Sequence, residues 1–339
     1  MPIRGHAIEA RIYAEDAERN FLPATGRIAH LRFPEGSERI RIDTGVQEGT
    51  EITPWYDPMI AKLVVRGADR AHAVAAMRQA LAEVEIAGVT TNVRFLRAVI
   101  SSRAFAAAEL DTVLIESNRE TLFDPKPIPP EMLAAAAFAE LLEEERTAHE
   151  RAAASRDRYS PWHLVDGWRL NEESHHDLVF TEGDVAHTVR LLFLESGLRI
   201  AIDGKTHALS GERLADGRLL VRLDERAFKA RAVREAGEWH VFCDGEHRRL
   251  GLKAELPGAD AHSAGGSLAA PMPGKVIKVM AEAGAKVSKG QALLILEAMK
   301  MEHTITAPAD GVVKEVHYRA GEQVLEGAEL ISLERNENA

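Results

Sequence analysis

The C-terminal part of the chain contains the same short pattern twice. The first copy, APMPGKVIKVMAEAGAKVSKGQALLILE, covers residues 270–297, and the second, APADGVVKEVHYRAGEQVLEGAELISLE, covers residues 307–334. Glycines and the final glutamate recur in both copies at a constant offset of 37 residues. A self-similar pair of β-rich segments predicts one small barrel built by duplication. The residues between the copies then form a hairpin that carries Lys300 into solvent.

Length, charge and cysteine content limit the class of protein. A chain of 339 residues has room for two or three domains. Its net charge of −11 argues against a nucleic-acid partner. The single cysteine, Cys243, excludes an internal disulfide and favours a buried structural role in a reducing compartment. No run approaches the ~18 apolar residues of a membrane span, and the N-terminus lacks the apolar core of a signal peptide. We therefore expect a soluble, cytoplasmic protein without a membrane partner.

The pattern of residues 1–121 predicts a small α+β lobe. Alternating or buried apolar positions favour strands, and apolar positions at helical spacing favour packed helices. The expected strands are GHAIEARIYA at 5–14, RIAHLRF at 27–33 and MIAKLVVRG at 59–67, and the expected helices cover 68–84 and 91–101.

A proline-rich segment at 123–130 cannot sustain a helix or a central strand, so it marks a domain boundary. A strongly helix-forming segment follows, with Pro130 suited to its first turn. Residues 161–254 then contain short alternating runs separated by dipeptides such as Asp203-Gly204, which suit tight hairpin turns. This spacing predicts about eight antiparallel strands in a barrel or sandwich, with the helix packed on or into it.

These features predict a β-rich α+β protein of several domains. It combines a small α+β lobe, an antiparallel β-barrel with a helix, and a flattened barrel of two quasi-symmetric halves. The small, unpatterned residues before the duplicated segment read as a flexible linker. The expected boundaries are 1–121 for the lobe, 122–160 for the proline-rich boundary and helix, 161–255 for the barrel, 256–269 for the linker and 270–335 for the duplicated domain.

The setting of Lys300 is specific. EAMKMEH at 297–303, together with APMPG at 270–274, resembles the biotin carrier domain of biotin-dependent carboxylases. The resemblance implies that Lys300 is the biotinyl-lysine, loaded by a biotin protein ligase, with Met299, Met301 and Glu297 as its cofactor-binding neighbours. Lipoyl domains share the implied fold, a flattened barrel of two halves, but normally differ around their lysine. The Met-Lys-Met triplet therefore favours biotin over lipoate.

Residues 1–120 carry a second resemblance. RGHAIEARIYAED at 4–16, FLPATG at 21–26, YDPMIAKL at 56–63 and GVTTN at 88–92 are similar, in this order, to the C-terminal lobe of biotin carboxylase. The resemblance implies that Arg11 lies beside the reacting biotin and is catalytic. A fixed guanidinium suits the stabilisation of negative charge on the ureido oxygen. From residue type alone, a surface ion pair with Glu9 or Glu15 is the alternative for Arg11.

In that family, ATP and Mg²⁺ bind in an ATP-grasp region upstream of this lobe. We identify no binding site for either in this sequence. It contains no glycine-rich phosphate loop beside a strand and no paired-carboxylate cluster. The adjacent His175 and His176 lack a third ligand at helical or hairpin spacing, so we expect no metal site. We therefore expect this chain alone not to carboxylate biotin.

The order of a helix followed by about eight strands resembles the element that docks the carboxyltransferase β subunit in two-subunit acyl-CoA carboxylases. SPWHLVDGWRLN at 160–171 looks most like the methylcrotonoyl-CoA type, with the propionyl-CoA type as an alternative substrate class. The sequence thus implies the biotin-carrying C-terminal portion of the α subunit of such a ligase, able to self-associate through its lobe. A stand-alone, non-enzymatic carrier and docking protein and an unproductive gene fragment remain as alternatives. Substrate identity and stoichiometry are left open.

Overall fold

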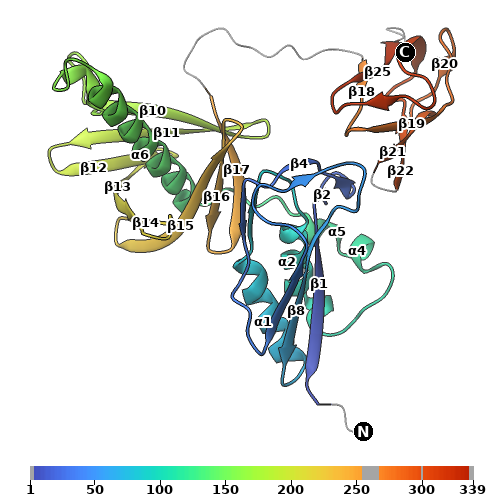
Figure 1. Cartoon of the computed structure of the whole chain (residues 1–339), viewed down its shortest axis with the longest axis horizontal. Coiled ribbons are helices and arrows are strands. Elements are labelled where there is room, and N and C mark those ends of the chain that lie inside the picture. Colours follow the sequence, from blue (N-terminus) through green and yellow to red (C-terminus); the bar gives the residue numbers. More distant parts are fainter. Residues whose placement is uncertain (1–3, 254–266, 299–300, 336–339) are drawn as a thin grey trace. The chain divides into compact units, whose positions relative to one another are not determined.

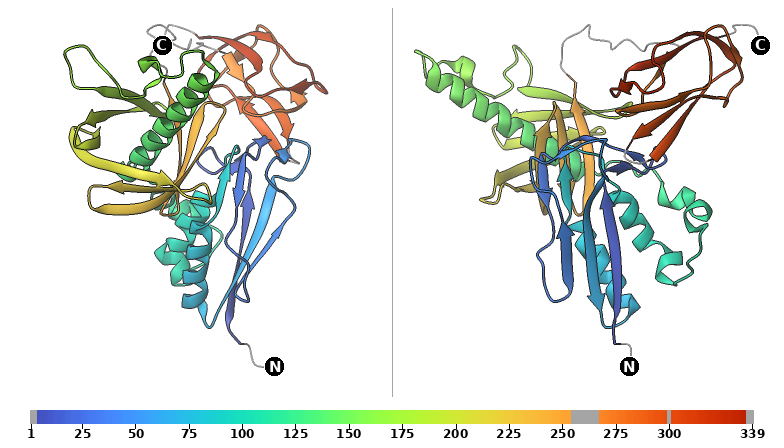
Figure 2. Two further views of the ribbon diagram at one scale, coloured as in Figure 1. Left: turned by 60° about the vertical axis from the view of Figure 1, so that its left-hand side comes forward. Right: turned by 45° about the vertical axis from the view of Figure 1, so that its right-hand side comes forward.

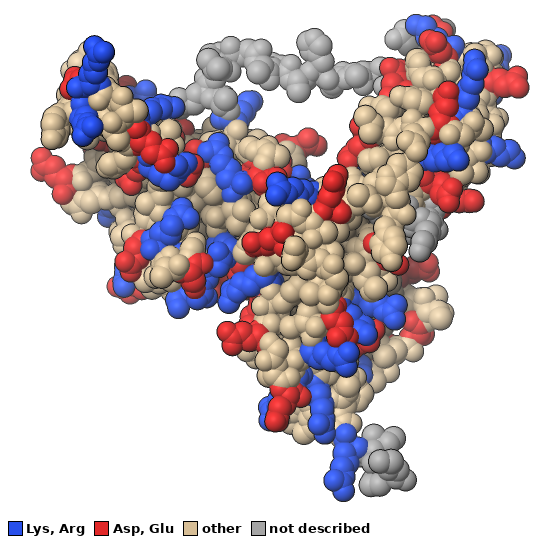
Figure 3. Space-filling view, viewed as in Figure 1, with Lys and Arg blue, Asp and Glu red and all other residues tan. Residues whose placement is uncertain are grey.

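The computed structural model describes residues 4–253, 267–298 and 301–335. We describe its lobe, its helix with the barrel, and its duplicated domain one at a time (Figure 1). Among the described residues, none of the helices combines the length and apolar character needed to cross a membrane. Acidic and basic side chains are interspersed over the face in Figure 3, as expected for a chain with 28% charged residues. The predicted β-rich α+β class is confirmed.

The lobe is built on an antiparallel three-stranded sheet in the order β1-β8-β6. Its inner face is apolar, since Ile12, Leu63 and Val65 are fully buried. Two predicted helices are confirmed as α1 and α2. The sheet strands are β1 His6–Tyr13, β6 Ile40–Thr44 and β8 Met59–Gly67. The short strands are β2 Glu15–Asp16, β3 Leu22–Pro23, β4 Gly26–Arg27, β5 His30–Arg32, β7 Glu51–Ile52 and β9 Glu85–Ala87. The helices are α1 Arg70–Ala82, α2 Val93–Ser101, α3 Arg103–Ala106, α4 Leu114–Ser117 and α5 Arg119–Leu122.

One expected strand in the lobe is wrong. The segment 27–33 does not form a single strand but is divided between β4 and β5. The backbone N–H of Ile28 donates to the carbonyl oxygen of Thr50 at 2.9 Å, while the carbonyl of Ile28 accepts from Gly49 at 2.7 Å. Both backbone groups of Ile28 are therefore bonded to residues 49 and 50, in the connection before β7. In a continuous strand they would pair with one neighbouring strand along its whole length. The alternating apolar pattern is present in the sequence, but its residues belong to two short β-ladders, β4 with β7 and β5 with β9.

Helix α6 spans Pro130–Ala154 and begins where the sequence predicts, with Pro130 in its first turn. Residues 123–129 form no helix or strand. The first half of α6 is buried on all sides, from Met132 to Leu141. Burial all around a helix requires partners in every direction, and eight strands supply them.

These strands form a closed antiparallel barrel in sequence order, from β10 to β17. Closure comes from β10 and β17, which pair Phe180 with Leu252 and Thr181 with Gly251. Figure 2 shows α6 running between the barrel strands, so the helix packs into the barrel and not onto it. The short 3-10 helix η1 Pro161–His163 precedes the barrel. Its strands are β10 His175–Glu182, β11 Val185–Leu194, β12 Gly197–Ile202, β13 Lys205–Arg213, β14 Leu219–Leu223, β15 Arg226–Glu235, β16 Glu238–Cys243 and β17 Glu246–Leu252.

The barrel interior holds one polar anchor on the helix. Glu140 is 4% exposed, and its carboxylate accepts a hydrogen bond from Trp239 Nε1 at 2.6 Å. Arg234 lies 3.4 Å from the same carboxylate. Because a buried acid needs such partners, this contact fixes the register of α6 against β16. Cys243 is buried on β16 as expected, and burial raises the pKa of its thiol to about 12.

The duplicated domain consists of two four-stranded sheets, ordered β18-β25-β23-β20 and β22-β21-β19-β24. Each repeat lends its shortest strand to the sheet of the other, because β20 pairs with β23 and β24 pairs with β19. Most of the linker predicted at 256–269 lies outside the described residues, but its last three residues form β18. The strands are β18 Ser267–Ala269, β19 Gly274–Val279, β20 Lys286–Val287, β21 Ala292–Ala298, β22 Met301–Thr306, β23 Gly311–Val316, β24 Gln323–Val324 and β25 Glu329–Arg335.

Candidate functional site

Strands β21 and β22 form the hairpin predicted between the two sequence repeats. Their register pairs Ala298 with Met301 and Glu297 with Glu302. The two residues of the connection, Met299 and Lys300, lie outside the described residues, as does the side chain of Met301. The structure therefore describes the strands on either side of the predicted biotinyl-lysine. The pairing of β21 with β22 as far as Ala298 and Met301 fits a lysine presented for modification between the two strands.

The hairpin is held on a rigid base. β21 lies between β22 and β19, and its inward side chains Leu294 and Leu296 are fully buried. Glu297 points outward and is exposed, opposite Glu302 on one side and Lys275 on the other. The glycine of the APMPG motif has a structural reason, since a Cβ at Gly274 would lie 2.8 Å from the carbonyl oxygen of Glu297. Glycine there allows β19 to approach the base of the hairpin.

His303, on β22, is a partly buried histidine close to this hairpin. Burial lowers its pKa below the ordinary value of a histidine. Its Nε2 atom is buried and has no hydrogen-bond partner among the described residues. A neutral imidazole tolerates this environment better than a charged one. The hairpin base is thus apolar on its inner side and charged on its outer side.

Arg11 lies on the outward face of β1 in the lobe, with 60% of its side chain exposed. Its Nε donates to Glu9 at 3.2 Å, so the ion pair considered as the alternative role is present. Hydrogen bonding to Glu9, followed by contact with Tyr13, raises the pKa of Arg11. The paired residue on β8 is Lys62. Arg11 is thus accessible and permanently charged, and its catalytic role stays a prediction.

Asn92 fixes the end of β1 and was missed as a site residue, although it belongs to the GVTTN motif. It is 4% exposed, and its Oδ1 accepts from the backbone N–H of Tyr13 at 3.0 Å. Its Nδ2 donates to the carbonyl of Arg11 at 3.2 Å and to Glu15 at 2.9 Å. Burial raises the pKa of Glu15, and the Asn92 hydrogen bond opposes that shift. Asn92 therefore sets the backbone from which Arg11 projects.

A third candidate surface lies where α6 leaves the barrel. The exposed half of the helix and residues 161–169 enclose a cavity of about 940 Å³. Two of its lining side chains, Trp162 and Trp168, are 88% and 64% exposed. We call residues 159–170 the aromatic segment. Exposed apolar side chains that cluster mark interaction sites more than single ones do, so this surface suits protein binding.

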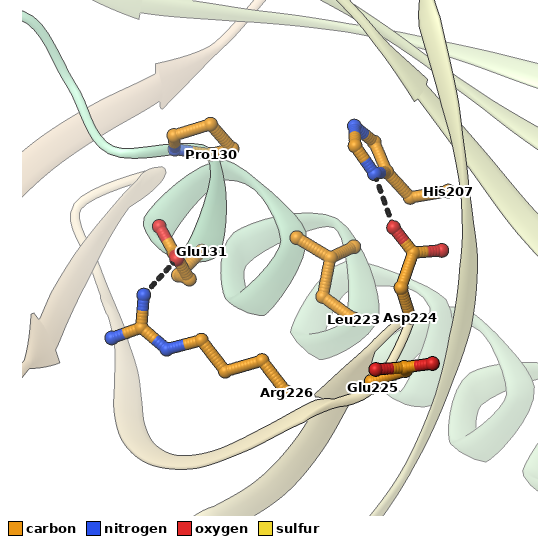
Figure 4. Close-up of a pocket in the computed structure, with 7 residues that line it drawn as sticks. All are labelled: Pro130, Glu131, His207, Leu223, Asp224, Glu225 and Arg226. Atoms are coloured by element: carbon orange, nitrogen blue, oxygen red, sulfur yellow. Dashed lines mark hydrogen bonds and ion pairs between the residues drawn. The ribbon is translucent and has the colours of Figure 1, made fainter.

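The opposite end of the barrel has a smaller cavity, of about 510 Å³, around the start of α6. Figure 4 shows two pairs among its charged groups, His207 with Asp224 and Glu131 with Arg226. His207 contacts Asp224 at 2.7 Å, and Arg226 pairs with Glu131 of the helix and with Asp244. The pair of Arg226 with Glu131 ties the helix start to the barrel, and the other two pairs join barrel residues to each other. We assign this cavity a structural role.

The chain matches three families in succession. Residues 9–117 match the biotin carboxylase C-terminal domain, residues 129–253 the methylcrotonyl-CoA carboxylase alpha-subunit BT domain, and residues 266–333 the domain of biotin-requiring enzymes. The last match supports covalent biotin as the cofactor. The paired strands β21 and β22 and the exposed Glu297 fit a lysine that carries such a group.

Several named relatives match most of the chain. The methylcrotonoyl-CoA carboxylase subunit alpha of Dictyostelium discoideum is 36% identical, over 90% of this chain and 45% of that protein. The corresponding mouse subunit is 33% identical, over 91% of this chain and 44% of its own length. The mouse propionyl-CoA carboxylase alpha chain is 32% identical, over 91% and 43%. The chain spans about half the length of these relatives. Over about nine tenths of its length, the chain is therefore similar to the α subunits of biotin-dependent acyl-CoA carboxylases.

Proposed function

We propose that this chain carries biotin on Lys300 and moves a carboxyl group between a biotin carboxylase centre and a carboxyltransferase β subunit, with methylcrotonoyl-CoA as the acyl acceptor in leucine catabolism. The observation that carries the proposal is the AMKM lysine between paired strands β21 and β22, in a domain of the biotin-requiring type. Bound biotin supplies a ureido nitrogen that accepts and donates the carboxyl group. The chain's residues position that group and recognise the partners.

Residues around the hairpin would serve recognition by a biotin protein ligase. Glu297 is exposed at the hairpin base and offers the ligase a fixed negative charge. Met299 and Met301 flank the lysine and offer adaptable apolar contact. The attached amide removes the charge of Lys300, so electrostatic attraction to the ligase weakens once the product forms. In the lobe, Arg11 would donate to the ureido oxygen and hold negative charge there, which favours loss of the ring N–H proton.

The β subunit would dock on the aromatic segment and the exposed half of α6. Aromatic side chains in a concave surface are the usual anchors of protein interfaces. Trp162 and Trp168 both line the 940 Å³ cavity, together with Arg169 and Arg151. Self-association through the lobe stays a prediction. The cytoplasmic location also stays a prediction, because the relatives' names place those proteins in mitochondria.

Replacing the lysine tests the carrier role. We expect Lys300→Arg to abolish avidin recognition of protein made in a biotin-replete host, as read by blot and intact mass. The folded domain should lose less than about 0.5 kcal/mol, which is usual for a surface substitution. Lys314→Arg, on the exposed side of β23, is the matched control and should keep the avidin signal. Wild-type protein with an unmodified position 300 would refute the proposal.

The docking surface is tested by co-purification with a methylcrotonoyl-CoA type β subunit. We expect the double variant Trp162→Ala/Trp168→Ala to weaken association at least about thirtyfold, as loss of a hot spot costs about 2 kcal/mol or more. Trp55→Ala, at a tryptophan of the lobe that is 57% exposed, is the control. Unchanged affinity in the double variant would place the partner elsewhere.

The acyl substrate is tested by the choice of partner. The similarity to propionyl-CoA carboxylase keeps propionyl-CoA as the second candidate. The assembled enzyme should carboxylate methylcrotonoyl-CoA faster than propionyl-CoA at equal concentration. A reversed preference would assign the chain to the propionyl-CoA type and would leave the carrier role intact.

A further inference from the structure

Residues 79–87, which comprise the end of α1 and β9, take part in two regions of the molecule. Through β9 they pair with β5 of the lobe. By their packing they group with the compact unit that contains the barrel, while the remaining lobe residues up to 110 do not. All four residues from Val84 to Ala87 are buried. A segment that is shared in this way is able to couple the two regions.

Glu85 is a buried acid in this segment. Its carboxylate accepts a hydrogen bond from Nε of Arg231, on barrel strand β15, at 2.6 Å. Only 11% of the Glu85 side chain and 14% of the Arg231 side chain are exposed. A charge at this depth is costly unless an opposite charge pairs with it, and loss of one partner leaves the other uncompensated. The ion pair therefore holds the segment to β15.

The barrel prepares the site that receives Glu85. Nη2 of Arg231 donates to the carbonyl oxygen of Asp216 at 3.1 Å, in the connection between β13 and β14. A Cβ at Gly217 would lie 3.3 Å from Nη1 of Arg231, so glycine leaves room for the guanidinium. In the same connection, the pKa of Arg218 is raised by its hydrogen bond to Asp216 and, to a smaller extent, by the charge of Glu85. Two arginines of the barrel thus act on one carboxylate.

The strands beside Arg231 carry uncharged rings on this outward face of the barrel. The register places Phe242 of β16 beside Arg231, and His247 of β17 beside Phe242. Phe242 is 7% exposed, and its ring stacks on that of His247 with 4.3 Å between the centroids. Burial lowers the pKa of His247 to about 3, so this ring is neutral. Such a surrounding of low polarity strengthens the attraction within the ion pair.

We propose that Glu85 and Arg231 form a latch that makes the lobe and the barrel move as one body. β9 is bonded to β5 of the lobe, and Glu85 of β9 is bonded to the barrel. The lobe therefore cannot turn away from the barrel without breaking a strand pairing or a buried ion pair. The latch itself needs neither biotin nor a partner. Its consequence rests on the proposed function: the carboxylase lobe and the docking surface keep one distance, and the carrier domain does the travelling.

The test is a distance measurement between two spin labels on the whole chain, by double electron–electron resonance. The labels are attached to Arg66→Cys on β8 and Thr206→Cys on β13, both at exposed positions. Cys243 stays unlabelled, because it is 6% exposed and burial raises the pKa of its thiol. We expect one narrow distance distribution with the latch intact, and Arg231→Met should make it at least about twice as wide. A distribution that is already broad with the latch intact would overturn the inference.

Three further variants complete the test. Arg190→Met is the matched control, since Arg190 is an outward barrel arginine paired with Asp177 on the neighbouring strand, and it should leave the width unchanged. Glu85→Gln keeps one acceptor oxygen and should widen the distribution less than Arg231→Met does. This milder variant decides the question if Arg231→Met unfolds, which circular dichroism reports.

The double variant Glu85→Leu/Arg231→Met leaves no unpaired charge in the latch. It should therefore return most of the way to the width of the intact protein. Equal widths in the intact protein, Glu85→Gln and Arg231→Met would show that the pair couples nothing, and would overturn the inference. A bare Lys300 would refute the proposed function and leave the latch untouched.

Discussion

The barrel is one closed sheet of eight strands and the duplicated domain is built from two four-stranded sheets, and the two fill their interiors in different ways. Ten successive residues of α6, from Met132 to Leu141, are buried, and all of them except Glu140 belong to the core cluster of the barrel. The duplicated domain has no helix among its described residues, and its core is supplied by equivalent positions of the two repeats. These positions are Ala270 and Ala307, Val276 and Val313, Val287 and Val324, Leu293 and Leu330, and Leu294 and Ile331.

The difference explains what each region can do. The stability of the barrel depends on the single helix that fills it. The barrel in turn holds the exposed half of α6 in a fixed direction for a partner. A domain built from two equal halves shares its stability between them, so its single hairpin can vary without loss of the core. The first arrangement suits an anchor, and the second suits a small mobile carrier.

The largest expected effect is a loss of barrel stability when a core side chain of α6 is removed. Phe138 is 6% exposed, and its ring packs where a Cβ at Gly211 would lie only 2.8 Å away. We expect Phe138→Ala to destabilise the barrel by about 3–5 kcal/mol. Hydrogen-exchange mass spectrometry during urea unfolding measures each region separately. The duplicated domain should unfold as in the wild type, and a common shift of both regions would contradict the comparison.

The next prediction tests whether the two repeats contribute equally to the stability of the duplicated domain. Leu293 and Leu330 are fully buried equivalents, and their carbonyls accept from Met280 and His317, which are also equivalent. Leu293→Ala and Leu330→Ala should each cost about 2–5 kcal/mol and should agree within about 1 kcal/mol. Thermal unfolding of the two variants gives the values. A strongly unequal pair would show that one half dominates the core.

A smaller effect concerns the anchor inside the barrel. Glu140→Ala leaves the buried Trp239 N–H without its acceptor and should cost about 1–3 kcal/mol. Glu150→Ala, at an exposed position later on the same helix, should change stability by less than about 0.5 kcal/mol. Trp239 fluorescence follows the unfolding of both variants. Equal stabilities would mean that apolar packing alone sets the helix register.

The smallest effect is the part of the pH dependence of the duplicated domain's stability that comes from His303. Burial lowers the pKa of His303 in the folded state, while the unfolded chain titrates near pH ~6.5. The unfolded state then binds more protons, so stability is full above about pH 6.5 and falls as the pH drops below it. His303→Asn should flatten the decline in melting temperature between about pH 7.5 and pH 5. Parallel curves for both proteins would exclude His303 as the cause.

The elements that could be predicted from the sequence are those set by residues close together in the chain. The turn dipeptides predicted about eight strands because each hairpin needs a residue with positive φ, and Asp203 and Gly204 adopt it. The repeat predicted two equivalent halves because identical spacing produces identical strands. The hairpin around position 300 followed from the same repeat.

The misses all depend on contacts between distant segments. Asn92 reaches Arg11 and Tyr13 across about 80 residues, and only the folded register brings Lys62 beside Arg11. The segment 27–33 alternates like one strand, yet backbone bonds to residues 49–50 divide it. Whether the helix lies on or in the barrel was also open, because an alanine-rich apolar stretch fits either position.

The enclosure of α6 has a consequence for biosynthesis. The ribosome completes residues 132–141 long before the closing strand β17 at Glu246–Leu252 exists. Until β17 pairs with β10, the barrel is not closed around this apolar segment of the nascent chain. Chains interrupted between these points leave it exposed, and exposed apolar surface of this kind favours aggregation.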